Sequence, residues 1–281
     1  MDSRPAGRQP PVAIAVAPNG GRKTRIDHPA VPISPAELAE TAAAAVSAGA
    51  AMIHVHVRDR YGDHLLDAAA YTDAIAAIRA AVGDRIVVQI TTESLGRYAP
   101  DGQMAVVRDV CPEAASLALR ELVPDAGHEA AFAEFLEFMK REAIAPQIIL
   151  YTPEEAVRLA GLIRRGVVPA DDIPVLYVLG RYAEGQRSAP ADLLPFLAPG
   201  QPRFGHWSVC AFGPREAICV ATGAYLGGHV RVGFENNVQL PDGTIAPDNA
   251  ALVDAAARLV RDGGFQTATA DALRASWTFG A

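Results

Sequence analysis

The sequence predicts a single α/β domain in which eight parallel strands close into a (β/α)8, or TIM, barrel. Short apolar runs alternate eight times with longer helix-like segments along the chain. Such strands pair in parallel, because each crossover between them needs a helix. The length of 281 residues, half of them hydrophobic, suits one such domain. Gly20 and Gly21 follow the first strand without the G-x-G-x-x-G order, which argues against a doubly wound dinucleotide-binding fold.

The individual elements follow from local patterns. The expected strands are residues 12–17, 52–57, 86–91, 115–119, 147–151, 175–180, 206–211 and 229–234. The expected helices are 35–48, 68–81, 103–110, 129–142, 153–165, 191–197, 214–222 and 248–262. Ser34 is a good N-cap for the first helix, and Pro35 suits its first position. We expect residues 12–281 to form the catalytic barrel and the polar, proline-rich residues 1–11 to be a disordered tail.

Composition excludes several classes of function. The net charge of −7 gives no overall attraction to nucleic acid or to an anionic membrane surface. The three cysteines are widely spaced and form no C-x-x-C pair, which argues against a disulfide framework and for a reducing compartment. The N-terminus has no apolar signal segment, and no apolar run approaches the roughly 20 residues of a membrane span. These features predict a soluble cytoplasmic protein.

The sharpest local signal is the sequence Ile53-His54-Val55-His56. Strand side chains alternate, so His54 and His56 point to the same face, near the carboxyl end of the strand where barrel active sites lie. Two buried imidazoles each need a polar partner, and a divalent metal ion satisfies both at once. The alternative is a pair of core histidines that bind backbone carbonyls or carboxylates.

Glu235 is the candidate third ligand. It shares one strand face with Arg231, and the eighth strand closes the barrel against the first, which neighbours the strand of His54 and His56. Two histidines and one glutamate with an open position form a known catalytic zinc arrangement. A solvated loop carboxylate is the alternative for Glu235.

Other polar residues follow the predicted strands. Thr91 and Thr92 can bind a substrate carboxylate or pass a proton, or they can cap a turn. Glu121 is either a catalytic acid–base group or an ion-pair partner of an arginine. His206 is a candidate lining residue of the substrate pocket.

The loop after the first strand is basic and contains glycine. Asn19 and Arg22 belong to it, together with Lys23 and Arg25. Such a loop can clamp a phosphate or carboxylate. A plain surface charge run is the alternative.

Three blocks of sequence resemble the β-keto acid cleavage enzymes, a family formerly described as a domain of unknown function. The blocks are HPAVPISP, IHVHVRD and GGHVRVGFENN, and they are followed by Asp248-Asn249-Ala250. The resemblance extends from Ala13 to about Ala268 in the same order. The best-described member of the family is the 3-keto-5-aminohexanoate cleavage enzyme.

The resemblance implies a zinc-dependent (β/α)8 barrel that takes a β-keto acid and acetyl-CoA and releases acetoacetate and a new acyl-CoA. The family's metal ligands match His54, His56 and Glu235, although another divalent ion is an alternative to zinc. Arg231 and the hydroxyl of Thr91 match a proton-handling group. The resemblance also implies a homo-oligomer, a dimer or a tetramer.

The chain departs from the family pattern in its acid–base group. The family pattern G-x-E-D-N has an acid after the glutamate, where this chain has Asn236, and an amide cannot act as a general base. We expect Glu93 or Glu121 to supply the missing carboxylate. The departures keep two other functions open: a metal-dependent lyase, aldolase or hydrolase that acts on a small keto acid without CoA, and a non-enzymatic metal- or ligand-binding protein.

Overall fold

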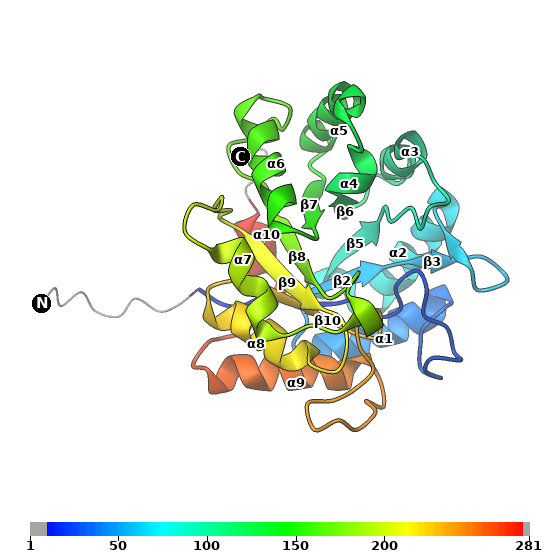
Figure 1. Cartoon of the computed structure of the whole chain (residues 1–281). Helices are drawn as coiled ribbons and strands as arrows, with labels where there is room; N and C mark the ends of the chain where they lie inside the picture. Colours follow the sequence, from blue (N-terminus) through cyan, green and yellow to red (C-terminus); the bar gives the residue numbers. More distant parts are fainter. Residues whose placement is uncertain (1–9, 278–281) are drawn as a thin grey trace, which may run out of the picture.

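The first and last barrel strands lie side by side and close the sheet. Strand β1 (Ile14–Val16) pairs in parallel with both β10 (His229–Val232) and β2 (Met52–Val55). In the computed structural model, which describes residues 10–277, the barrel order is β1-β10-β9-β8-β7-β6-β5-β2 (Figure 1). The other strands are β5 (Val87–Thr91), β6 (Ala114–Ala118), β7 (Ala145–Leu150), β8 (Val175–Leu179) and β9 (Trp207–Ala211). The predicted (β/α)8 barrel is therefore confirmed.

Helices cover the outside of the sheet. They are α1 (Pro35–Ala48), α2 (Ala68–Val82), α3 (Pro100–Val110), α4 (Leu119–Leu122), α5 (Glu129–Arg141), α6 (Pro153–Arg164), α7 (Leu194–Leu197), α8 (Glu216–Tyr225) and α9 (Asn249–Asp262). A further helix, α10 (Ala270–Ser276), follows. None of the helices between residues 10 and 277 combines the length and apolar character that a membrane crossing needs. The predicted tail, residues 1–11, falls largely on residues 1–9, which lie outside the described residues, as do residues 278–281.

Helix α1 shows how local sequence sets the boundaries. The Ser34 side chain accepts a hydrogen bond from the Glu37 backbone N–H, and the Glu37 carboxylate accepts one from the Ser34 N–H at 2.9 Å. This reciprocal capping satisfies donors that the first turn leaves free. Gly49 ends the helix at φ +110°, a conformation that favours glycine.

Several elements differ from the sequence prediction, and two of the differences shape the barrel. The strand expected at 52–57 leaves the barrel after Val55, and β3 (Val57–Arg58) then pairs antiparallel with β4 (His64–Leu65). Helix α10 was not predicted because it has only seven residues. It packs its Ala270 and Leu273 against inward side chains at the amino ends of the strands, including Ala13 and Met52. This helix closes the base of the barrel.

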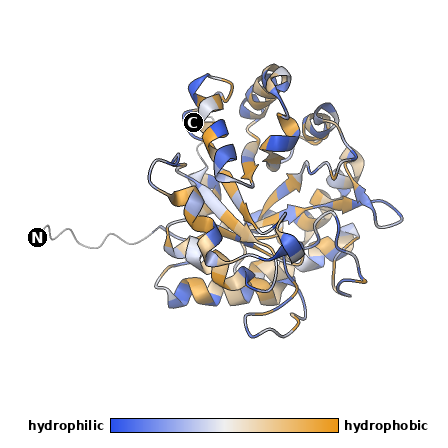
Figure 2. Cartoon of the chain, in the orientation of Figure 1, coloured by the Kyte–Doolittle hydropathy of each residue, from blue (hydrophilic) through white to orange (hydrophobic). Residues whose placement is uncertain are grey.

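Strand alternation divides the core in two. Outward strand residues such as Ile53, Val55 and Ile90 pack against the helices in one large hydrophobic cluster. Figure 2 shows this apolar character along the central strands, with polar residues on the outer helix faces and loops. Several inward positions are polar instead, and they include His54, Gln89, Gln147 and Arg231. A buried polar interior above a closed base places the site at the carboxyl ends of the strands.

Candidate active site

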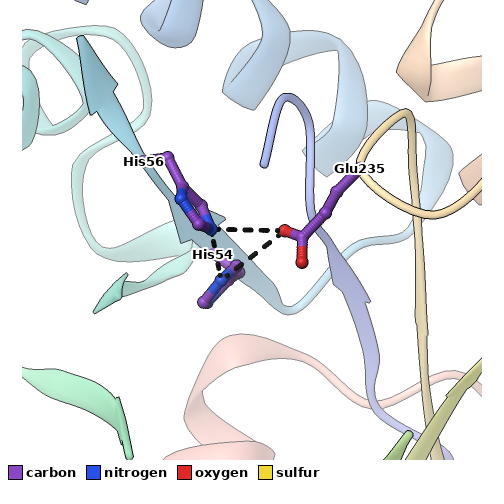
Figure 3. Close-up of side chains that lie close together, drawn as sticks. All are labelled: His54, His56 and Glu235. Atoms are coloured by element: carbon purple, nitrogen blue, oxygen red, sulfur yellow. Dashed lines mark hydrogen bonds and ion pairs between the residues drawn. The ribbon is translucent and has the colours of Figure 1, made fainter. Parts of the chain in front are cut away.

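Three predicted side chains from opposite ends of the chain meet at the mouth of the barrel. Figure 3 shows the imidazoles of His54 and His56 and the carboxylate of Glu235 pointing toward one another. The two Nε2 atoms lie 3.1 Å apart, and Glu235 Oε2 lies 3.6 Å from His54 Nε2 and 3.4 Å from His56 Nε2. Each histidine is only 1% exposed. Nothing in the ordinary packing of a core requires three such polar atoms to converge.

The backbone of the β10 end delivers Glu235 to this point. Gly233 adopts φ +138°, and a Cβ there would collide with the backbone of Ala17. The Glu235 N–H donates to the Ala17 carbonyl at 3.1 Å, which ties the end of β10 to that of β1. The conformation of Gly233 thereby lets the chain turn Glu235 over the top of the neighbouring strand.

The loop after β1 passes close over the same side chains. A Cβ on Gly20 would lie 2.5 Å from Glu235 Cγ, and one on Gly21 would lie 2.9 Å from Glu93 Oε2. Arg58 holds the loop by donating to the carbonyls of Gly20 and Lys23. The paired glycines thus permit a close approach of backbone to the site, which is a role that the sequence reasoning did not assign to them.

A line of amides inside the barrel fixes the tautomer of His54. The Nδ1 of His54 lies 2.8 Å from Gln89 Oε1, while Gln89 Nε2 donates to Gln147 Oε1 at 3.2 Å. Because the Gln89 oxygen can only accept, Nδ1 of His54 carries the proton and Nε2 offers its lone pair. Burial lowers the pKa of His54 to about 4 and that of His56 to about 3, which keeps both rings neutral.

Glu235 stays ionised in spite of its burial. Burial alone would raise its pKa, but the Arg231 guanidinium, 2.9 Å from Oε1, and the two histidines hold the pKa well below its usual range. Its other oxygen, Oε2, has no hydrogen-bond partner among the described residues. A buried anionic oxygen of this kind is a suitable ligand atom for a cation.

The three donors fit a tetrahedral divalent ion. Ligand bonds of zinc are about 2.0–2.2 Å for nitrogen and oxygen, which puts neighbouring donors roughly 3.3 Å apart. The separations of 3.1, 3.4 and 3.6 Å surround that value. Neutral imidazoles and an ionised carboxylate are also the protonation states that such an ion requires.

Thr91 and Glu93 line the cavity beside the three donors, whereas Glu121 does not. Glu93 Oε2 lies 3.9 Å from His56 Nδ1, and its Oε1 lies 3.3 Å from Arg181 Nη2. Burial, reinforced by the charge of Glu235, raises the pKa of Glu93 to about 7 despite Arg181. Glu121 instead accepts hydrogen bonds from the Ser94 N–H and from Gln103 Nε2, both at 2.9 Å. Of the two carboxylates that the sequence offered as acid–base groups, only Glu93 therefore lies at the cavity.

Asn236 lies behind Arg231 with a weak contact to it. Its Oδ1 is 3.5 Å from Arg231 Nη2, and its buried Nδ2 has no partner within residues 10–277. The amide offers no acid–base group there.

Comparison with known proteins assigns the chain to a family. A family model described as beta-keto acid cleavage enzyme matches residues 11–278. The chain belongs to the β-keto acid cleavage enzyme family.

The alignments with two named enzymes extend over nearly the whole chain. It is 30% identical over 276 residues to a 3-keto-5-aminohexanoate cleavage enzyme of Fusobacterium nucleatum, and the alignment covers 93% of this chain and 95% of the relative. It is 28% identical over 272 residues to a 3-oxoadipate:acetyl-CoA acetyltransferase of Cupriavidus necator, with 94% of each covered. A solved structure, the ternary complex of ObcA with a C4-CoA adduct and oxalate, superposes with a TM-score of 0.71 over 89% of this chain and 67% of the other, at 18% identity. At that identity the structural likeness supports the fold alone.

Two residues that the sequence predicted to bind substrate, Thr92 and Asn19, donate hydrogen bonds to backbone carbonyls. Thr92 Oγ1 donates to the Ser116 carbonyl at 2.9 Å, away from the cavity. Asn19 Nδ2 donates to the carbonyls of His56 and Pro32, at 2.9 and 3.0 Å, and so joins the first loop to the β2 end. Arg22 does line a cavity, the outer one between the first loop and Arg181.

The structure places His206 away from the cavity that the three donors line. His206 precedes β9 at its amino end, on the opposite side of the barrel from the three donors. Its Nε2 accepts a hydrogen bond from Trp277 Nε1 at 2.8 Å, and its ring lies 4.3 Å from that of His229. His206 therefore belongs to the closed base.

The sequence reasoning also missed residues that complete the site. Gln89 shares a strand face with Thr91, so alternation offered a signal for it. Arg181 lies two residues after the end of β8 and lines both the inner and the outer cavity. A basic residue just after a barrel strand was the available signal.

Proposed function

We propose that this chain is a divalent-metal-dependent β-keto acid cleavage enzyme that uses acetyl-CoA. The observation that carries the proposal is the triangle of His54, His56 and Glu235 in a cavity that Thr91, Glu93 and Arg231 also line. Zinc is the favoured ion, because two imidazoles and one carboxylate in tetrahedral reach are typical zinc ligands.

The proposed reaction exchanges acyl groups between two carbon skeletons. R–CO–CH2–COO⁻ and CH3–CO–SCoA give CH3–CO–CH2–COO⁻ and R–CO–SCoA. The bond between C2 and C3 of the keto acid breaks, and C2 forms a new bond to the acetyl carbon. The sulfur of CoA leaves the acetyl group and joins the released acyl group, so atoms, electrons and protons balance.

The residues of the chain supply proton handling and orientation. Glu93 is the proposed proton acceptor at C2, because its carboxylate faces the cavity while that of Glu121 does not. Thr91 Oγ1 already accepts the Glu93 N–H at 3.0 Å, so its hydroxyl hydrogen is free to donate to a substrate oxygen. A bound divalent ion would supply Lewis-acid stabilisation of the developing oxyanion.

A path for the CoA thioester leads outward over the first loop. The outer cavity shares Glu93, Arg181, Phe212 and Glu235 with the inner one. Arg22 and Lys23 line its other side. We propose that these two cations meet the phosphates of CoA outside the barrel. A homo-oligomer and a cytoplasmic location stay predictions from the sequence.

One assay tests the proposal. Purified protein, with its metal content measured, is incubated with a panel of β-keto acids with and without acetyl-CoA. We expect acetoacetate and the new acyl-CoA to form in equal amounts, and only when acetyl-CoA is present. Removal of the ion by a chelator should abolish this activity, and addition of the ion should restore it.

Because Asn236 places an amide beside Arg231, a CoA-independent lyase, aldolase or hydrolase is the second candidate. Product formation without acetyl-CoA would establish that candidate and refute the first.

A further inference from the structure

The mouth of the barrel is divided into a polar half and an apolar half. The polar half comes from β2, β5, β10 and the segments that follow them, and it carries the three metal donors with Thr91, Glu93 and Arg231. The apolar half comes from β6, β7, β8 and the end of β9. Its apolar cavity-lining members are Ala118, Ile149, Val178 and Phe212, and Tyr151 and Arg181 line the same side of the cavity where β7 and β8 end. We call the first four residues the apolar wall.

The apolar wall is a separate packing unit inside the barrel. Its members contact one another together with Leu176, Cys210 and the half-buried Tyr151, apart from the large cluster under the helices. Ile149 and Val178 face inward because their neighbours along the strands, such as Ile148 and Leu179, face the helices. The wall thus presents carbon atoms to whatever lies opposite the metal donors.

Each charged side chain of the cavity already has a partner of opposite charge. Arg231 pairs with Glu235 at 2.9 Å, and Arg181 pairs with Glu93 at 3.3 Å. The Arg181 guanidinium also lies 5.2 Å from the centre of the Phe212 ring, at the edge of the wall. A charged group placed against the wall would lose its water without gaining a counter-ion, which is strongly unfavourable.

We propose that the substituent R of the β-keto acid is a short, uncharged hydrocarbon that packs against the apolar wall. This inference rests on the proposed function and names its substrate class. The carboxylate and ketone of the substrate must lie in the polar half, because the donors and Arg231 are there, so R extends toward Ile149 and Val178. The enclosed space of the cavity is only about 20 Å³, which limits R to a short group.

Three acids of equal chain length test the class. They are 3-oxohexanoate, 3-oxoadipate and 5-amino-3-oxohexanoate, which carry a neutral, an anionic and a cationic substituent. With acetyl-CoA fixed, we expect kcat/KM for 3-oxohexanoate to exceed both others by about 100-fold or more, as burial of an unpaired charge predicts. Equal or better turnover of either charged acid overturns the inference and leaves the proposed function standing.

Binding without turnover keeps the two failures apart. The same acids are titrated calorimetrically into the zinc-loaded protein without acetyl-CoA. If no acid turns over but 3-oxohexanoate still binds most tightly, the proposed reaction fails and the preference for a neutral substituent holds. If binding does not favour 3-oxohexanoate, the inference fails whatever the turnover.

A charge swap in the wall gives a sharper test. Ile149 is the most exposed member of the wall at 7%, so Ile149→Glu places a carboxylate in the cavity. We expect the preference for 5-amino-3-oxohexanoate over 3-oxohexanoate to rise by about tenfold or more. Ile149→Gln introduces a side chain of about the same volume as glutamate but without its charge, so it should produce no such rise. Val178→Glu and Val178→Gln repeat the comparison if the first pair does not fold, and an unchanged preference in both pairs overturns the inference.

Discussion

The Nδ1 of His54 lies 2.8 Å from Gln89 Oε1, and this contact presents the opposite nitrogen of the ring to His56 and Glu235. The amide of Gln89 is itself oriented, because its Nε2 donates to Gln147. Such outer partners of a metal-binding histidine fix its tautomer and orientation.

Replacement of Gln89 by leucine should weaken metal binding. The variant leaves the Nδ1 proton of His54 without an acceptor, and loss of such a partner typically costs about 10–100-fold in metal affinity. Competition with a chromophoric zinc chelator measures the Kd. Gln89→Glu is the matched control, because it restores an acceptor and should recover the affinity. Wild-type affinity in the leucine variant would show that Gln89 does not orient His54.

Removal of a proposed ligand should abolish retention of the ion. His54→Ala and Glu235→Ala each leave two donors, and we expect less than a tenth of the wild-type zinc after gel filtration, with no turnover. The measurement is metal content per protein by mass spectrometry. Because Glu235→Ala also leaves the buried Arg231 without its carboxylate, thermal melting must show that each variant is folded. A folded variant with full metal content contradicts the ligand set.

Residue patterns predicted the candidate metal-site triad but only part of its surroundings, for a physical reason. Alternation along a strand places His54 and His56 on one face, and closure of β10 on β1 brings Glu235 to them; both relationships follow from the chain alone. The position of a side chain along the barrel axis, at the mouth or at the base, does not follow from the chain alone. His206 was assigned to the mouth, but it precedes the start of β9 and lies at the base. Arg181 lies in a loop, where no periodicity indicates its direction.

The two candidate carboxylates should differ sharply in their effect on catalysis. Glu93→Gln removes the carboxylate that faces the cavity, and we expect kcat to fall by about 10²–10⁴-fold, the usual contribution of a positioned base. Glu121→Gln changes only a carboxylate that accepts from Ser94 and Gln103, so kcat should stay within a few-fold of the wild type. Steady-state kinetics at saturating acetyl-CoA decide between them. Similar losses in both variants, with metal content unchanged, would remove Glu93 from the proposed role.

The base of the barrel should make the protein sensitive to acid independently of the metal. Burial, with a smaller effect of His229, lowers the pKa of His206 to about 3, while the unfolded value is near 6.5. Between these values the unfolded chain binds the proton and the folded chain does not, so the free energy of unfolding falls as pH falls through this window. From pH 7.5 to 5 the loss from His206 is about 2 kcal/mol.

Urea unfolding at pH 7.5 and pH 5 measures this contribution. His206→Gln keeps a carbonyl that can accept the Trp277 indole N–H but removes the titrating ring. The loss of stability between the two pH values should therefore be smaller in the variant than in the wild type. Both proteins are studied at the same zinc concentration, so that protonation of His54 and His56 contributes equally to each. Equal losses in the two proteins would mean that His206 is protonated in the folded state or is not buried at the base.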